Sequence, residues 1–294
     1  ASVGVAIFPD NANTAKDLFL AADETMYLAK EDGKNCYKIY NKQSQEYFSN
    51  KDQYISKLIL EVIESRSVEP YVQPIVSLQD NTIFAYEVLM RIKDINDDQI
   101  IAANRFISIA ERMGMIQQLD LILLEKVLEY VNDIKNIKFF LNLSPKTLNS
   151  STDLEKIIFL LNKFNYNNLV FEITERETIK DFDSLRRFIF ALKKLGVEFA
   201  IDDFGSGFSS YLYIKEIPID YIKIEGNFIR TMLTNEIDRV FIESIVKMAK
   251  ILNIKTIAEF VENKMIMDAL NNSHIDYIQG NYIKKPFPLI EISK

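Results

Sequence analysis

Polar side chains interrupt several short apolar segments of the sequence. They are Glu87, Asn142, Glu172, Asp202, Asp203, Lys223 and Glu259. Carboxylate and amide oxygens suit hard divalent cations such as Mg²⁺ and Mn²⁺, and no Cys or His cluster exists to suit zinc. Because Asp202 and Asp203 are adjacent, one carboxylate could bridge two ions and so hold both oxygens of a phosphoester displacement. The residues therefore predict a two-metal phosphodiesterase.

Most of these residues lie at or near the ends of segments that have the composition of buried strands. The predicted strands are Tyr71–Val76, Ile83–Leu89, Lys138–Leu143, Leu169–Ile173, Val197–Ile201, Asp220–Ile224, Lys255–Ala258 and Asp276–Gln279. Their alternation with helical segments predicts an α/β fold, a TIM-like (β/α)8 barrel. The first two strands are joined by too few residues for a crossover helix, so we expect them to be antiparallel. The carboxyl ends of barrel strands meet at one face, where unpaired carboxylates would repel one another and need cations.

A smaller region precedes the predicted barrel. Residues 2–8 and 36–40 are predicted strands, and residues 14–30 a helix between them. Beyond a polar stretch at 41–50, apolar residues at helical spacing predict a connecting helix. We therefore expect a short N-terminal β-α-β region at 1–42, a linker helix at 43–67 and the barrel at 68–294.

Composition excludes several classes of protein. The 294 residues carry 35 Lys and Arg against 42 Asp and Glu, a net charge of −7 that argues against binding to duplex nucleic acid. Because there is a single cysteine and no apolar run of ~18 residues, we expect a soluble, cytoplasmic chain without a membrane segment. The chain begins inside a predicted strand, so we expect it to be part of a longer protein, which missing N-terminal domains could attach to a membrane.

Short motifs in residues 68–290 also resemble those of EAL-domain cyclic-di-GMP phosphodiesterases. They are Gln-Pro-Ile (73–75), Glu-Val-Leu-Met-Arg (87–91), Leu-Asn-Leu-Ser-Pro (141–145), Phe-Glu-Ile-Thr-Glu (171–175), Asp-Asp-Phe-Gly-Ser-Gly-Phe-Ser-Ser (202–210), Ile-Lys-Ile (222–224), Ala-Glu-Phe-Val-Glu (258–262) and Gln-Gly followed by Lys-Pro (279–286). Each motif alone is weak, but all of them in this order are specific. The resemblance implies hydrolysis of cyclic-di-GMP to linear pGpG in bacterial second-messenger signalling.

The resemblance also implies a role for each site residue. Two Mg²⁺ or Mn²⁺ ions would be held, the first by Glu87, Asn142, Glu172 and Asp202, and the second by Asp202, Asp203 and Glu259. Lys223 and Glu262 would position or deprotonate the attacking water. A lysine at its ordinary pKa of about 10.4 is protonated, so an orienting or charge-stabilising role for Lys223 stays open. Substrate would be bound by Arg91, at its phosphate, and by Gln73, Leu89, Gln279 and Pro286 around guanine and ribose.

By the same resemblance, the loop 203–210 couples dimerisation to metal occupancy, with Glu175 as its anchor, and a helix near 236–252 supplies much of a homodimer interface.

The sequence departs from the family pattern at Val88, Phe260, Asn281 and Lys284. Val88 leaves the neighbouring motif residues in place, whereas Phe260 adds an aromatic ring close to the second metal. The other two put the contacts to guanine in doubt.

The first forty residues resemble the C-terminal end of a GGDEF diguanylate cyclase domain, through residues 2–9, 22–30 and 33–35. The glycine-acid turn of that family is absent, so no cyclase activity is expected. Two alternatives to the phosphodiesterase stay open. One is a catalytically silent cyclic-di-GMP receptor that signals through its dimer interface, and the other is a metal-dependent barrel that acts on another phosphoester or an enolisable acid.

Overall fold

A computed structural model gives the fold of the chain. It describes residues 2–31, 36–94, 98–132, 134, 136–164, 168–174, 182–205, 214 and 216–292. The chain divides into two compact units, Ala1–Glu61 and Val62–Lys294. Within the described ranges, no helix combines the length and the apolar character needed to span a membrane.

The N-terminal unit contains a parallel strand pair and a helix. Strand β1 (Val3–Val5) pairs with β2 (Tyr37–Ile39), and α1 (Ala15–Glu31) connects them. A Cβ atom at Gly4 would lie 2.0 Å from the backbone oxygen of Ala22, so this approach of β1 to α1 requires glycine. Helix α2 (Lys42–Ser65) follows and includes most of the polar stretch as well as the predicted apolar stripe.

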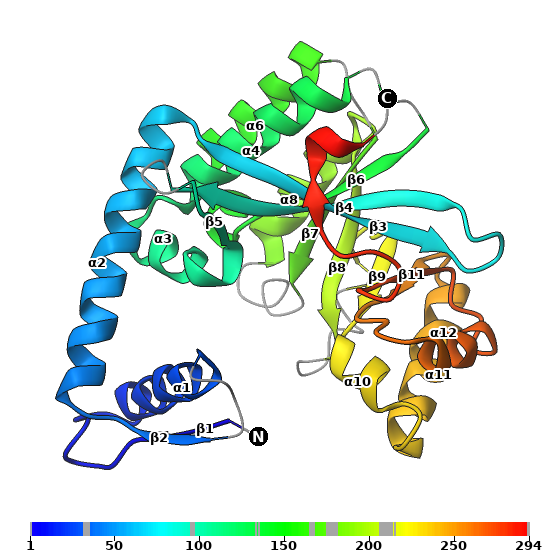
Figure 1. The fold of residues 1–294 in the computed structure, drawn as a ribbon. Helices are drawn as coiled ribbons and strands as arrows, with labels where there is room; N and C mark the ends of the chain where they lie inside the picture. Colours follow the sequence, from blue (N-terminus) through cyan, green and yellow to red (C-terminus); the bar gives the residue numbers. More distant parts are fainter. Residues whose placement is uncertain are drawn as a thin grey trace. The chain divides into compact units, whose positions relative to one another are not determined.

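A closed barrel forms the centre of the second unit (Figure 1). Of the described strands, eight follow one another around it and return to the first. They are β3 (Val68–Ser77), β4 (Ile83–Lys93), β6 (Lys138–Asn142), β7 (Leu169–Thr174), β8 (Glu198–Phe204), β9 (Tyr221–Ile224), β10 (Lys255–Ala258) and β11 (Tyr277–Gln279). Strands β4 and β6 to β11 run parallel, whereas β3 is antiparallel to both neighbours, β4 and β11. The predicted TIM-like barrel and its antiparallel first pair are confirmed.

Two short strands extend the barrel sheet. Strand β5 (Ile100–Ala102) pairs with β4, and β12 (Phe287–Pro288) pairs with β3, both antiparallel. Neither was predicted, because three and two residues are too few to show an alternating pattern.

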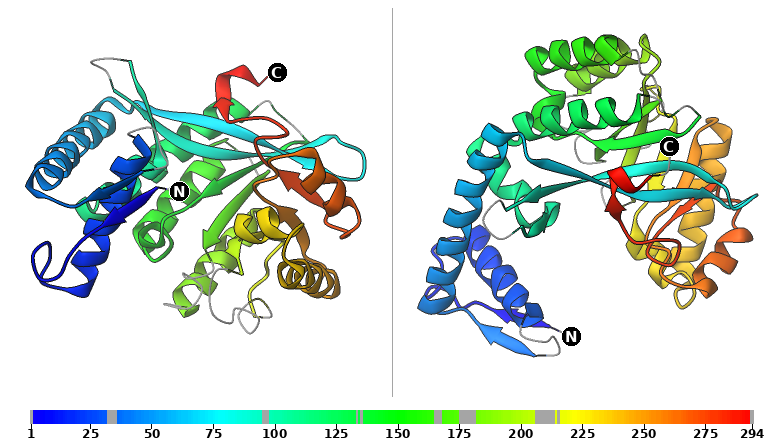
Figure 2. Two further views of the ribbon diagram at one scale, coloured as in Figure 1. Left: turned by 60° about the horizontal axis from the view of Figure 1, so that its bottom comes forward. Right: turned by 45° about the horizontal axis from the view of Figure 1, so that its top comes forward.

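Helices lie outside the barrel strands (Figure 2). The described helices are η1 (Ala103–Arg105), α3 (Ile107–Met113), α4 (Ile116–Val131), α5 (Pro145–Leu148), α6 (Ser151–Phe164), α8 (Phe182–Lys193), α10 (Gly226–Thr231), α11 (Glu236–Ile251), α12 (Lys264–Asn271) and η2 (Leu289–Glu291). In α8, the inward residues are Leu185, Phe188, Ile189 and Leu192. In α11, the inward residues are Ile242, Ile245, Val246 and Ala249.

A layer of apolar side chains fills the barrel. It consists of Ile75, Ala85, Phe140, Val170, Ala200, Tyr221 and Ile257. Side chains two residues apart on a strand point to the same face, so the next layer towards the carboxyl ends of the parallel strands comes from positions two residues later. Those positions are Glu87, Asn142, Glu172, Asp202, Lys223 and Glu259. The alternation of the strands therefore stacks a polar layer directly on the apolar core.

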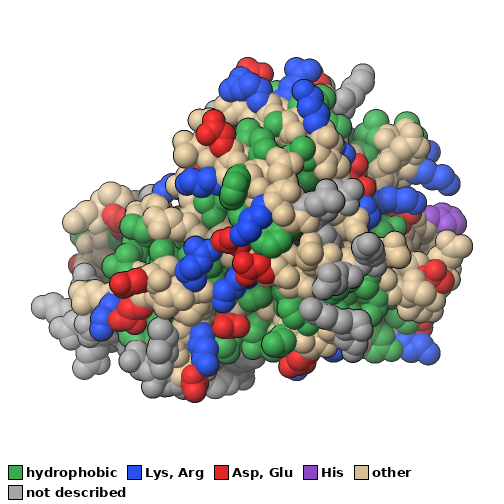
Figure 3. Space-filling view, turned by 90° about the horizontal axis from the view of Figure 1, so that it is seen from above, with side chains coloured by type: hydrophobic (Ala, Val, Ile, Leu, Met, Phe, Trp, Pro, Cys, Tyr) green, Lys and Arg blue, Asp and Glu red, His purple; other side chains and the backbone are tan. Residues whose placement is uncertain are grey.

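Acidic and basic side chains are interspersed on the face of the molecule shown in Figure 3, and no extended basic patch covers its described residues. This agrees with the net charge of −7.

Candidate functional site

Strand pairing brings the predicted metal ligands together at one end of the barrel. Asn142 of β6 and Glu172 of β7 are partners in the strand register. Asp202 lies in β8 beside Thr174 of β7. Glu259 follows the last residue of β10, which pairs in register with β9. Side chains that are far apart in sequence thus meet because their strands are neighbours in the barrel.

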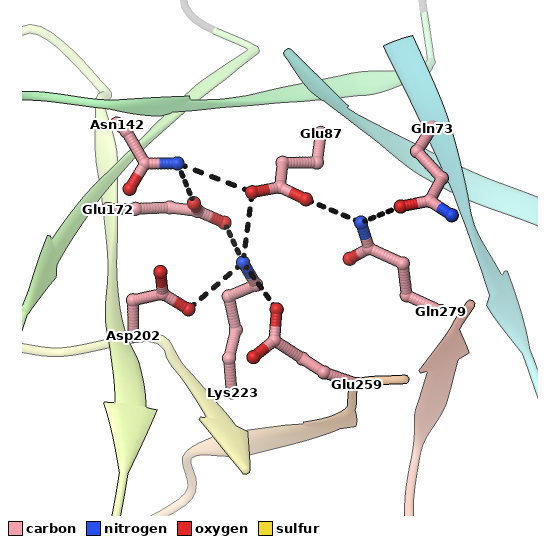
Figure 4. A network of polar contacts seen from close by, with 8 residues as sticks. All are labelled: Gln73, Glu87, Asn142, Glu172, Asp202, Lys223, Glu259 and Gln279. Atoms are coloured by element: carbon pink, nitrogen blue, oxygen red, sulfur yellow. Dashed lines mark hydrogen bonds and ion pairs between the residues drawn. The ribbon is translucent and has the colours of Figure 1, made fainter. Parts of the chain in front are cut away.

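Lys223 occupies the centre of this polar layer (Figure 4). Its side chain is fully buried, and its Nζ atom lies 2.8 Å from Glu172 Oε1 and 3.3 Å from Glu87 Oε1. The distances from Nζ to Asp202 Oδ1 and to Glu259 Oε1 are both 3.0 Å. Four carboxylates therefore share one ammonium group.

One lysine does not satisfy this cluster. An ammonium group has three N–H donors, so it cannot donate to four carboxylates at once. Glu172 Oε1 and Asp202 Oδ1 are buried without a hydrogen bond, although both lie within ion-pair distance of Lys223. The cluster retains excess negative charge in a place where unpaired charge costs several kcal/mol per ion. These orphaned oxygens are suited to a further cation.

The ionisation of the site reflects the same imbalance. Burial, together with repulsion from neighbouring carboxylates, raises the pKa of Glu259 to about 8 despite the nearby lysine. The pKa of Glu172 lies well above its ordinary value for the same reasons. Burial opposes the ionisation of Glu87, but the charge of Lys223 and a hydrogen bond from Gln279 hold its pKa below the ordinary value. Burial also disfavours the charged form of Lys223, yet the surrounding carboxylates raise its pKa well above the usual range, so it is a permanent cation here.

Amide side chains fix the orientation of the carboxylates. The amide of Asn142 donates to Glu172 Oε2 at 2.7 Å and to Glu87 Oε1 at 3.3 Å. The amide of Gln279 donates to Glu87 Oε2, and also to Gln73 Oε1 at 3.1 Å. Gln73 in turn donates to the backbone oxygen of Lys284. This chain of hydrogen bonds links the carboxylate cluster to the predicted substrate residues of β3 and β11 (Figure 4).

A group of acids beside the lysine has the geometry of a metal site. Carboxylate oxygens of Asp202, Asp203 and Glu259 all lie within 4.8 Å of one another. Asp203 has a φ of 53°, which turns its side chain out of the regular strand pattern of β8. Oxygen donors alone, with no histidine or cysteine among them, suit Mg²⁺ or Mn²⁺. The residues present therefore fit divalent cations.

A cavity of about 350 Å³ opens above the acidic group. It is lined by Gln73, Glu87, Leu89, Asp202, Asp203, Glu259, Phe260, Glu262, Gln279, Gly280 and Asn281. Most of the predicted substrate and water-handling residues thus line one cavity next to the predicted metal ligands. An enclosed volume of this order can hold part of a nucleotide-sized ligand.

The remaining predicted residues lie at different distances from this cavity. Arg91 is two residues beyond Leu89 on β4, donates to the Met90 backbone oxygen at 2.8 Å and lies over the ring of Tyr71. Pro286 directly precedes β12, which pairs with β3 beside Gln73. Neither is among the described residues that line the cavity. Glu175 and residues 206–210 of the predicted loop lie outside the described part of the chain.

Sequence reasoning did not identify Arg230 of α10. Its guanidinium contacts Glu262 Oε1 through two nitrogens and lies 4.3 Å from the centre of the Phe260 ring. No motif marks this arginine.

Comparison with known proteins assigns the family. The EAL domain family matches residues 57–286. The chain belongs to the EAL domain family. Cyclic di-GMP phosphodiesterase PdeB of Shewanella oneidensis is 33% identical over an alignment 297 residues long, which covers 98% of this chain and 34% of that protein. Cyclic di-GMP phosphodiesterase PdeA of Borreliella burgdorferi is 34% identical over 258 residues, 85% of this chain and 38% of that protein. The chain spans about a third of the length of these relatives.

Solved EAL structures share the barrel. The phosphodiesterase PaMucR in complex with c-di-GMP matches with a TM-score of 0.77 at 24% identity, over 82% of this chain and 100% of that one. An EAL domain protein from Listeria monocytogenes EGD-e matches with a TM-score of 0.72 at 28% identity, over 81% of this chain and 95% of that one. These likenesses support the fold described above.

Proposed function

We propose that this EAL domain hydrolyses cyclic-di-GMP to linear pGpG in a reaction that depends on two divalent metal ions. One observation carries the proposal, namely the buried cluster of four carboxylates around Lys223 that still has excess negative charge. The names of the two relatives given above, both cyclic di-GMP phosphodiesterases, support the choice of substrate.

The metal ligands follow from the donor set. Glu87, Asn142, Glu172 and Asp202 would hold one ion, and Asp203 and Glu259 a second that shares Asp202. Bound Mg²⁺ or Mn²⁺ acidifies a coordinated water and neutralises charge that develops on the phosphodiester. Asn142 and Gln279 keep the carboxylates of Glu87 and Glu172 directed at the centre of the barrel mouth.

Lys223 is proposed to orient the attacking water or to stabilise charge. In the metal-free site the surrounding carboxylates raise its pKa above the ordinary value, which supports a charged side chain there. Its position among the carboxylates suits it to orient a nucleophilic water or to stabilise charge on the phosphate oxygens. Glu262 lines the cavity and is more exposed than the buried acids. It is therefore the remaining carboxylate placed to orient that water or to accept a proton from it.

Other residues that line the cavity would bind the nucleotide. Gln73 and Gln279 present amide groups and Leu89 an apolar surface, which suits a guanine edge and a ribose. Arg91 has a planar fork that binds a phosphate through two hydrogen bonds, and it extends the same face of β4 beyond Leu89. Pro286 would border this subsite from β12.

Three wider proposals accompany the activity. Exposed apolar side chains of α11, among them Ile237 and Val240, support a homodimer through the helix 236–252, with the loop 203–210 contributing. Residues 1–42 are proposed to be the C-terminal remnant of a GGDEF domain, 43–67 a linker helix and 68–294 the EAL domain. The β-α-β order of the N-terminal unit supports that division.

Hydrolysis of cyclic-di-GMP by the purified chain tests the proposal. Linear pGpG should form with Mg²⁺ or Mn²⁺, should not form with EDTA, and should be lost in Glu87→Gln. Lys255→Met is the matched control, since Lys255 ends on the surface in an ion pair with Asp276. Tight binding of cyclic-di-GMP without product under any divalent ion would instead identify a silent receptor. Absence of both binding and cleavage would leave another phosphoester as substrate.

A further inference from the structure

An arginine, an aromatic ring and a glutamate form a contact unit at one wall of the cavity. Phe260 and Glu262 both line the cavity and follow strand β10. Arg230 lies on α10 and contacts both of them. Its Nε and Nη2 atoms lie 3.2 Å and 3.1 Å from Glu262 Oε1, and its Cζ atom lies 4.3 Å from the centre of the Phe260 ring. The guanidinium therefore holds the carboxylate and the ring together.

The backbone of this wall is shaped to place the ring. Phe260 has a φ of 53°, a left-handed conformation that costs a residue with a side chain about 1 kcal/mol or more. A Cβ atom added at Gly226 would lie 2.1 Å from Cδ2 of the ring. The first residue of α10 must therefore be glycine for the ring to lie against the helix, while Arg230 contacts the ring one helical turn later.

We propose that Arg230 is a positioning residue of the hydrolytic site, which fixes Glu262 and Phe260 as one wall of the cavity although it does not itself line that cavity. The inference rests on the proposed phosphodiesterase activity and deepens it. The Arg230 side chain is 40% exposed and so is not a buried anchor; its effect comes from restricting the orientations of Glu262. Each of its two contacts is modest alone, but both restrict the same side chains.

Kinetics of hydrolysis with Mn²⁺ test this role. Arg230→Gln should lower kcat about five- to tenfold, the size expected when one exposed ion pair and one cation–π contact are lost. Arg230→Lys keeps the charge but loses the planar fork, so it should lower kcat by a smaller factor. Arg186→Gln is the matched control, because Arg186 also lies over an aromatic ring, that of Phe190, on the surface of α8. It should retain the kcat of the wild type.

A double-mutant cycle separates positioning from a merely structural role. In the Glu262→Gln background, measured in single turnover with excess enzyme so that slow cleavage is visible, Arg230→Gln should lower the rate by a smaller factor than in the wild-type background, because only its contact with Phe260 remains to be lost. A full additional loss in that background, or an unchanged kcat in both Arg230 variants, overturns the inference. Thermal unfolding midpoints of all variants should match that of the wild type, which checks that the fold is retained. If the wild-type chain itself does not cleave cyclic-di-GMP, the proposed function has failed and not this inference alone.

Discussion

Replacing Lys223 by methionine should destabilise the metal-free protein, and divalent ions should restore part of the lost stability. Methionine has a similar length and no charge, so Lys223→Met removes a cation that lies within 3.3 Å of all four carboxylates. The remaining cluster would hold only negative groups. These groups would repel one another unless they take up protons or bind metal.

The distances set the size of the effect. At 2.8 to 3.3 Å, each carboxylate attracts the ammonium by about 5 kcal/mol at an effective dielectric constant near 20. Most of that attraction offsets the cost of burying the charges, and the net loss on removing one partner of a buried pair is about 3–5 kcal/mol. Without the lysine, the pKa values of Glu172 and Glu259 rise further above their unfolded values. Stability of the variant is therefore present at low pH and lost as the pH rises through those folded values.

Urea denaturation in EDTA measures this effect. At about pH 8 we expect Lys223→Met to lose about 3–5 kcal/mol of unfolding free energy, and less at about pH 5. Mn²⁺ at a hundred times its dissociation constant should restore about 2.7 kcal/mol. The control Lys255→Met, whose side chain is 56% exposed, should change stability by less than about 1 kcal/mol. A Lys223→Met protein as stable as the wild type in EDTA at pH 8 would refute the electrostatic account of the site.

Three further predictions concern other parts of the second unit. Burial raises the pKa of Asp120 from 3.8 to about 6, so the folded protein binds an extra proton and its stability falls as the pH rises between these values. In urea titrations, Asp120→Asn should lack this pH dependence and should be more stable than the wild type by up to about 3 kcal/mol at pH 7. Parallel pH profiles of the wild type and the variant would contradict the prediction. Gly226→Ala should lower kcat, because the added methyl group would displace the Phe260 ring, and it should not change kcat in a Phe260→Gly background. An equal loss of kcat in both backgrounds would show that the methyl group displaces something other than the ring. Ile237→Glu on the exposed face of α11 should convert the proposed dimer to monomer in sedimentation experiments, whereas an unchanged sedimentation coefficient would place the interface elsewhere.

The barrel was predictable because its strands are short apolar segments with regular helical segments between them. Strand ends were less predictable, and β8 is the clearest example. The apolar pattern ends at Ile201, but the strand continues to Phe204 through both aspartates, with an irregular register between those positions. Pattern recognition ends a strand where apolar residues stop, whereas backbone pairing continues for as long as the neighbouring strands provide partners.

The members of the site were predictable because a polar residue within an apolar strand needs a reason to be buried. Their arrangement was not. Lys223 was expected to handle water or phosphate, but nothing in the sequence indicates that its ammonium lies at the centre of four carboxylates. Arg230 was missed for a related reason, since its contacts with Phe260 and Glu262 depend on how α10 packs against the segment after β10. Such contacts follow from tertiary packing and leave no local pattern.

Anomalous diffraction from crystals of the chain grown with Mn²⁺ and a non-hydrolysable cyclic-di-GMP analogue tests the central claim most directly. The account predicts two manganese peaks about 3.5–4 Å apart. One should be bounded by Glu87, Asn142 and Glu172, the other by Asp203 and Glu259, with Asp202 between them and one phosphodiester of the analogue against both. No manganese peak among these carboxylates, or an analogue bound away from them, would contradict it.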